Sequence, residues 1–141
     1  MIEFLFETAR TVTDFILTST AQRFGRMRLI VPHLGGVLPL LTERVELFRT
    51  INGEPADRTT VAETLGQFYY DLAGTPSKFQ IAALTSIAKP DRLLYGSDYA
   101  WTRREHSLHL LTALDVAFDG INAGWRARTT RNADVLLPQR R

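Results

Sequence analysis

Short apolar runs that end in a polar residue recur along the chain and predict the strands of a parallel sheet. Leu29–Val31 is a continuous, β-branched run of the kind found in strands that are buried on both faces. Pro32 cannot donate to a strand ladder, so the strand should end there and leave His33 at its carboxyl end. Leu93–Tyr95 repeats the design and leads through a glycine turn to Asp98. The pattern predicts an imidazole and a carboxylate at two strand ends, where α/β folds carry their chemistry.

A third run, Gln67–Leu72, predicts a strand between these two in the sequence, with Asp71 near its end. Apolar residues spaced three and four apart predict helices in the other segments. The predicted helices are Phe4–Ala21; a helix with Pro39 in its first turn and a stripe of Leu38, Leu41, Val45 and Phe48; a short helix to about Leu65, capped by Thr59 or Thr60 with Glu63 in its first turn; a helix that buries Phe79, Ile81, Leu84 and Ile87; a helix with Leu108, Leu111, Leu114 and Phe118 on one face; and a last helical segment, continuous or interrupted, over about Ile121–Leu137. Because a helical crossover follows each strand, the strands should be parallel βα units.

Three polar side chains, those of His33, Asp71 and Asp98, fall at the predicted carboxyl ends, which form the active-site edge of a parallel barrel. On its own, His33 fits a hydrogen-bonded core residue as well as a functional one. The second strand end with Asp98 favours the functional interpretation. Asp71 is either a further polar contact or, as we favour, a residue that caps the following loop. Trp101 either walls the pocket or packs against the fold.

The composition is that of a globular protein of one domain. A length of 141 residues and an apolar content of 45% leave room for a real core. The chain contains no cysteine, which excludes disulfides and thiolate metal sites and fits a cytoplasmic protein. No apolar run is long enough to span a bilayer, and the N-terminus lacks the order of a secretory signal, so we expect no membrane partner.

The distribution of charge favours no nucleic-acid partner. The net charge is +2, from 17 Lys and Arg against 15 Asp and Glu. Basic residues gather near the C-terminal end, where only Asp134 opposes Arg126, Arg128, Arg131, Arg140 and Arg141. Apart from Trp125, no aromatic residue is interleaved with them, which favours a solvated face over nucleic-acid binding.

Several stretches occur in the order of a known family over almost the whole chain. They are Glu3–Thr8, Arg23-Phe24, Arg28–Pro39, Tyr70-Asp71, Pro90–Tyr99 and Arg131–Pro138. The set resembles the amidohydrolase-related family, the metal-dependent (β/α)8 barrels that include aminocarboxymuconate-semialdehyde decarboxylase and its salicylate- and resorcylate-type relatives. The resemblance implies an α/β fold in which the three strands are about the sixth to eighth of a TIM barrel. Residues 1–141 would then form a single partial amidohydrolase-related domain.

The resemblance also implies roles for the two strand ends. His33 corresponds to the family's acid/base group, and Asp98 corresponds to a metal ligand that is also credited with activating bound water. The implied activity is decarboxylation or hydrolysis of a small aromatic or enoic carboxylic acid, with a divalent metal, zinc by expectation. A carboxylate suits such a cation, and an imidazole can transfer a proton near neutral pH. Two departures from the family pattern touch neither residue: Leu34 stands where Gly is common, and Ala100 where Pro is common.

The family's His-x-His pair of the first strand and the His of the fifth strand have no counterpart in this sequence. His106 and His109 lie one turn apart on the predicted helix after Asp98, and we interpret them as surface residues rather than ligands. A full barrel needs about 250 residues, so we expect the C-terminal part of an enzyme that is incomplete by itself. The isolated chain should bind zinc weakly or not at all, and its partner should be a second copy or a complementary N-terminal half. The alternative is a non-catalytic remnant or interaction module of the same fold, so whether this chain alone is an enzyme stays open.

Overall fold

The computed structural model describes residues 2–121 and 124–137, and its centre is a sheet of three parallel strands. The strands are β1 (Ile30–Val31), β2 (Tyr69–Asp71) and β3 (Leu93–Leu94), in the spatial order β1-β2-β3. In the register of the sheet, Val31 lies beside Tyr70, and Tyr70 lies beside Leu93. The prediction of parallel βα units is therefore confirmed, although each strand is shorter than the apolar run that predicted it.

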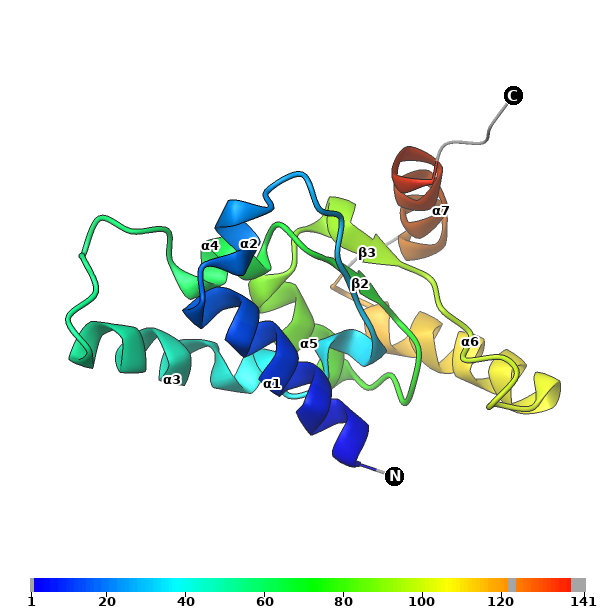
Figure 1. Ribbon diagram of the computed structural model, residues 1–141. Helices are drawn as coiled ribbons and strands as arrows, with labels where there is room; N and C mark the ends of the chain where they lie inside the picture. Colours follow the sequence, from blue (N-terminus) through cyan, green and yellow to red (C-terminus); the bar gives the residue numbers. More distant parts are fainter. Residues whose placement is uncertain (1, 122–123, 138–141) are drawn as a thin grey trace.

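Helices follow the strands in the predicted order (Figure 1). They are α1 (Glu3–Leu17), α2 (Thr20–Arg23), α3 (Leu38–Ile51), α4 (Val61–Leu65), α5 (Lys78–Ile87), α6 (Arg104–Phe118) and α7 (Trp125–Leu136), with 3-10 turns η1 (His33–Gly35) and η2 (Pro90–Arg92). None of these helices, which all lie within the described ranges, combines the length and the apolar composition needed to cross a membrane.

Successive strand residues point to opposite faces, and the two faces of this sheet have different coverings. One face carries Val31, Tyr70 and Leu93, which belong to the main core together with buried residues of α1, α4, α5 and α6. Tyr69 and Leu94 point to the other face and pack against the C-terminal part of α7, whose ribbon lies beside β3 in Figure 1. The strand ends therefore emerge at one edge of a sheet that is anchored on both sides.

The prediction of one continuous helix over Phe4–Ala21 is wrong. The first helix ends at Leu17, and a second, short helix begins at Thr20. Thr18 Oγ1 donates to the carbonyl of Asp14 at 2.7 Å, and Ser19 takes a left-handed conformation with a φ of 56°. Hydroxyl side chains offer the backbone alternatives to helical hydrogen bonds, which explains the break at this position.

The buried stripe of α3 differs from the predicted one. Leu41 and Phe48 are exposed, while Leu38, Thr42 and Arg49 are buried. The burial of Arg49 is possible because its guanidinium donates to Glu54 at 2.7 Å and to the carbonyl of Thr59 at 3.1 Å. This arrangement joins the helix to the loop that follows it, a contact that helical periodicity cannot indicate.

Two other apolar predictions are also wrong: Phe79 on α5 is 87% exposed, and Leu108 on α6 is exposed as well. The last helix begins at Trp125, after Gly124 in a left-handed conformation, and not at Ile121. Within the predicted last segment, residues 122–123 lie outside the described residues, as do Pro138, Arg140 and Arg141.

The predicted cap of the short helix is confirmed at Thr60. Its hydroxyl accepts a hydrogen bond from the Glu63 amide at 3.1 Å, and the Glu63 carboxylate accepts one from the Thr60 amide at 2.8 Å. This reciprocal pair is a capping box, and it lowers the pKa of the Glu63 carboxyl because hydrogen bonds favour the charged form.

Candidate active site at the carboxyl ends of the strands

The turn after β1 determines where His33 points. Pro32 is extended and ends the strand, and His33 and Leu34 then take left-handed conformations with φ values of 56° and 59°. Gly36, with a φ of 58°, passes so close to α1 that a Cβ there would lie 2.9 Å from the carbonyl oxygen of Leu5. The chain therefore needs glycine at this approach, and the turn is held against the first helix.

The imidazole of His33 lies in a partly enclosed position, with 23% of its side chain exposed. The ring of Phe4 meets it edge-on, with the two ring centroids 4.8 Å apart. Gly74 lies on another side, where an added Cβ would come within 3.5 Å of His33 Cδ2. The Nδ1 atom is buried and has no hydrogen-bond partner among the described residues.

Asp98 reaches the same place from the end of β3. His33 Nε2 and Asp98 Oδ1 are 3.8 Å apart, although the two residues are far apart in the sequence. Thr102 holds the carboxylate, since its hydroxyl donates to Asp98 Oδ2 at 3.0 Å and its amide donates to the Asp98 carbonyl at 2.8 Å. The structure thus brings together the two side chains that the sequence placed at separate strand ends.

Asp71, at the end of the middle strand, accepts two backbone hydrogen bonds on one oxygen. Its Oδ1 takes the amide of His33 at 2.9 Å and the amide of Ala73 at 3.0 Å. The bond from Ala73 caps the following loop, as the favoured interpretation of the sequence expected. The bond from His33 also makes Asp71 a polar contact of the first strand end, so the two alternatives for this residue are not exclusive.

The arrangement at this edge has the groups needed for proton transfer. An imidazole lies beside a carboxylate here, both partly shielded from water, and an imidazole is the side chain that most often accepts or donates a proton in catalysis. Asp98 also offers oxygen to a hard divalent cation. The described residues contain no group of three or more His, Cys, Asp or Glu side chains that could hold a metal ion. By themselves they do not form a complete metal site.

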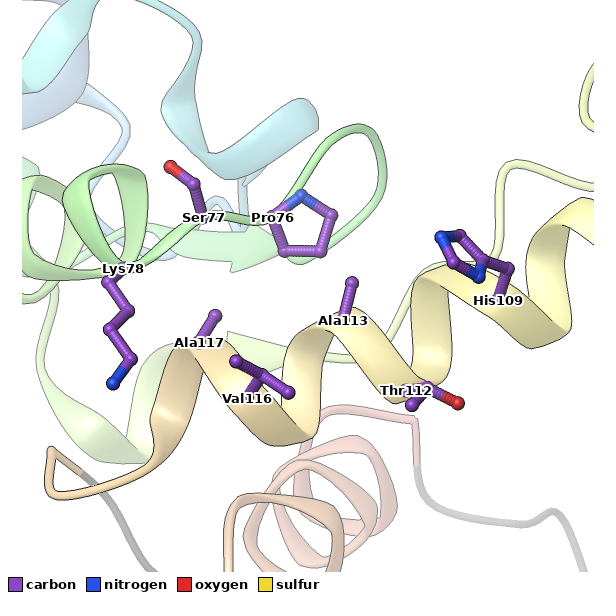
Figure 2. Close-up of a pocket in the computed structure, with 8 residues that line it drawn as sticks. All are labelled: Pro76, Ser77, Lys78, His109, Thr112, Ala113, Val116 and Ala117. Carbon is purple, nitrogen blue, oxygen red and sulfur yellow. The ribbon is translucent and has the colours of Figure 1, made fainter.

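The other candidate residues lie apart from this pair. His106 and His109 are exposed on α6, with their rings 6.1 Å apart, as expected for surface residues. An open, largely apolar groove of about 330 Å³ lies between α6 and the start of α5. Figure 2 shows its lining residues, with His109 at one end of the row along α6. The lining of this groove includes neither His33 nor Asp98. Trp101 is 94% exposed, so it does not pack against the described part of the fold.

Three contacts of the site were absent from the sequence prediction. Phe4 meets His33 from the first helix, and helical periodicity gives no signal for such an encounter. Thr102 supports Asp98 from four residues further on, a spacing that could have suggested a side-chain contact across a turn. The bond from His33 to Asp71 joins two strands and depends on their register, which no local pattern contains.

Comparison with known proteins gives one family throughout. The family model described as amidohydrolase matches residues 4–130. The 6-methylsalicylic acid decarboxylase of Aspergillus aculeatus is 30% identical over 106 residues, which cover 70% of this chain and 32% of that protein. The 6-methylsalicylic acid decarboxylase of Penicillium expansum is 28% identical over 101 residues. This chain spans about a third of the length of the curated relatives that it matches.

Solved structures with the α/β barrel fold of amidohydrolases superpose on nearly the whole chain. The IDCase of Metarhizium anisopliae in its apo form gives a TM-score of 0.77 at 27% identity, covering 94% of this chain and 39% of that one. The 5-carboxyvanillate decarboxylase of Novosphingobium aromaticivorans, solved with manganese and 4-hydroxy-3-methoxy-5-nitrobenzoic acid, gives a TM-score of 0.73 over 94% of this chain and 39% of that one. Its identity of 16% shows a common fold and no more.

Proposed function

The chain belongs to the amidohydrolase family, and from that premise we propose that it carries part of the active site of a decarboxylase that acts on a small aromatic carboxylic acid. The names of the relatives support decarboxylation over hydrolysis, because two curated relatives are 6-methylsalicylic acid decarboxylases. The chain covers only about a third of their length, so activity and substrate class are parts of this proposal.

The observation that carries the proposal is the approach of His33 to Asp98. Their facing side-chain atoms are 3.8 Å apart at the carboxyl edge of a parallel sheet, the edge that bears the chemistry of barrel enzymes. Decarboxylation of an aromatic acid breaks the bond between the ring carbon and the carboxylate, and a proton takes the place of the departing CO2. We assign the movement of that proton to His33, with Asp98 as the neighbouring carboxylate.

The proposal extends to a divalent cation with Asp98 as one of its ligands. A relative of the same fold was solved with manganese, and zinc is the metal that we expected from the sequence. Fewer than three potential ligands group together among the described residues, so the remaining ligands would come from outside them. In this proposal β1, β2 and β3 are the sixth to eighth strands of the barrel, and residues 1–141 form one partial domain. A cytoplasmic location and assembly with a second copy or a complementary N-terminal half complete it.

The alternative, a non-catalytic protein of the same fold, is favoured by one observation. This is the small number of potential metal ligands that the described residues bring together. A protein of this kind would keep the geometry of His33 and Asp98 without turning over a substrate.

The test is an assay of CO2 release from 6-methylsalicylate and dihydroxybenzoates in the presence of Mn²⁺ or Zn²⁺. The chain is assayed alone and together with a fragment of the Aspergillus aculeatus relative that lacks the matched region. We expect His33→Ala to lower the rate by about 10²- to 10⁴-fold, the usual contribution of a positioned acid/base group. Asp98→Ala should lower both the rate and the amount of metal retained.

His106→Ala is the matched control, since it removes the same side chain from an exposed position on α6 and should leave the rate unchanged. CO2 release that persists in both site variants would show that neither strand end is the site. The absence of CO2 release from both preparations would favour the non-catalytic alternative.

A further inference from the structure

The backbone at His33 has a conformation that the rest of the molecule must hold in place. His33 and Leu34 both have φ values near 60°, and Gly35 and Gly36 continue the run of positive φ. Residues with a Cβ rarely adopt this backbone conformation, and it persists only where the surrounding structure imposes it. The direction of the His33 imidazole depends on this turn, so a contact that stabilises the turn also positions the imidazole.

Asp71 makes such a contact from the neighbouring strand. Its Oδ1 accepts the amide of His33 at 2.9 Å and the amide of Ala73 at 3.0 Å, so one oxygen joins the ends of β1 and β2. The Asp71 side chain is only partly exposed, and both bonds are partly buried. Since a carboxylate oxygen is a strong acceptor, the bond from the His33 amide fixes the peptide group that precedes the His33 side chain, and the bond from the Ala73 amide holds the carboxylate in place.

The third strand end contacts the same side chain. A Cβ added at Gly96 would lie 3.2 Å from both Cβ and Cγ of Asp71, so the backbone that leads to Asp98 passes directly against it. The register agrees, because Asp71 lies beside Leu94, two residues before Gly96. Asp71 therefore touches the chain segments that carry both members of the proposed acid/base pair.

We infer that Asp71 is a positioning residue, which sets the direction of His33 toward Asp98 by accepting the His33 amide. This inference rests on the proposed function, in which His33 moves the proton. It assigns to Asp71 a role that depends on its oxygen as an acceptor and not on its charge. The other possible role, direct contact of the carboxylate with substrate or metal, would depend on the charge.

The substitution Asp71→Asn separates these two roles. An amide oxygen can accept both backbone N–H groups, as Oδ1 does here, but the side chain is neutral. Asp71→Ala removes the acceptor altogether. Asp57→Ala, in the exposed loop after α3, is the matched control for loss of a carboxylate elsewhere.

The first measurement is amide hydrogen exchange by NMR, which needs no activity. In Asp71→Ala the amides of His33 and Ala73 should exchange at least about tenfold faster, since a hydrogen bond to a charged acceptor is lost. The amide of Ile81, in the core helix α5, serves as the reference for a general loss of stability and should change much less. In Asp71→Asn both amides should exchange clearly more slowly than in Asp71→Ala, because a neutral amide oxygen still accepts them, and Asp57→Ala should change neither.

The second measurement is the decarboxylation assay described above. Asp71→Ala should lower kcat by about 10²-fold with little change in KM, the effect expected when a catalytic group is displaced by about 1 Å. Asp71→Asn should restore most of kcat. If Asn is as poor as Ala in this assay, the charge of Asp71 is required and the inference is wrong.

The two proposals fail in different ways. Unchanged exchange of the His33 amide in Asp71→Ala would overturn the positioning role, whatever the activity. A protein without decarboxylase activity that still shows the expected exchange pattern would overturn the proposed function, while the contact between Asp71 and His33 would stand.

Discussion

Leu34 combines a backbone conformation that favours glycine with a side chain that the core requires. Its φ is 59° and its ψ is 22°, yet only 4% of the residue is exposed, and its side chain belongs to the main core. Leu34→Gly would remove a left-handed penalty of about 1–2 kcal/mol. It would also empty the space of a buried leucine, and Leu→Ala alone costs about 2.7–5.0 kcal/mol. Packing outweighs the strain, so we expect Leu34→Gly to destabilise the protein by about 1–4 kcal/mol.

Comparing the Gly and Ala variants at Leu34 with the same two variants at Leu84 isolates the contribution of the backbone. Leu84 is also fully buried, but it lies in the regular helix α5. At Leu84 the Gly variant should be less stable than the Ala variant by about 1 kcal/mol, because glycine is the poorer helix former. At Leu34 the left-handed conformation favours Gly over Ala, so this gap should be smaller by at least about 1 kcal/mol, or reversed.

The assay is urea unfolding followed by far-UV circular dichroism, with the free energies compared only where the m-values agree. Equal Gly–Ala gaps at the two positions would show that Leu34 is not strained in solution. A Leu34→Gly variant as stable as the original protein would show that the leucine side chain contributes nothing to the core. Either result would refute this account of the turn between β1 and α3.

The remaining predictions concern one buried hydroxyl and one surface carboxylate. The hydroxyl of buried Tyr70 donates to the carbonyl of Leu65 at 2.9 Å, and burial raises the pKa of this phenol. Tyr70→Phe leaves that carbonyl without its donor and should lower the free energy of unfolding by about 1–3 kcal/mol in the same urea assay, whereas no loss would mean that the carbonyl finds another partner. Hydrogen bonding from Arg126 holds the pKa of the Asp115 carboxyl below its ordinary value, so this carboxylate should stabilise the protein above about pH 4 and lose that effect as the pH falls through the lowered pKa. Asp115→Asn should therefore flatten the acid side of a profile of melting temperature against pH, and an unchanged profile would contradict this.

The parts of the fold that the sequence predicted are those with local signals. The apolar run before Pro32 and the run before Gly96 marked two strands, since punctuation by proline and glycine and a β-branched composition need no tertiary information. Thr60 and Glu63 are three residues apart, and their spacing alone defines the capping box. Once these strand boundaries were predicted, the placement of His33 and Asp98 at the strand ends followed from them.

The errors concern features that depend on neighbours in space. Phe48 and Phe79 occupy apolar positions of helical patterns, yet both side chains are exposed in the described structure. Arg49 is buried because two partners from the following loop satisfy its guanidinium, and an amphipathic pattern treats any arginine as a surface residue. Periodicity predicts that a helix has an apolar stripe, but the surface against which the stripe packs is determined by the other elements.

The positioning of His33 and the completion of a catalytic centre make different demands on this chain. The turn at His33, the acceptor Asp71 and the approach to Asp98 all use atoms of the described residues, so their geometry can be measured on this polypeptide. A metal centre needs more ligands than those residues group together. Hydrogen exchange at His33 therefore tests this local geometry independently of catalysis. The assay with an added fragment of a relative tests whether the same geometry supports decarboxylation when more of a barrel surrounds it. If the His33 amide shows the expected exchange but the assay shows no CO2 release, the proposed reaction is wrong while the arrangement of the site stands.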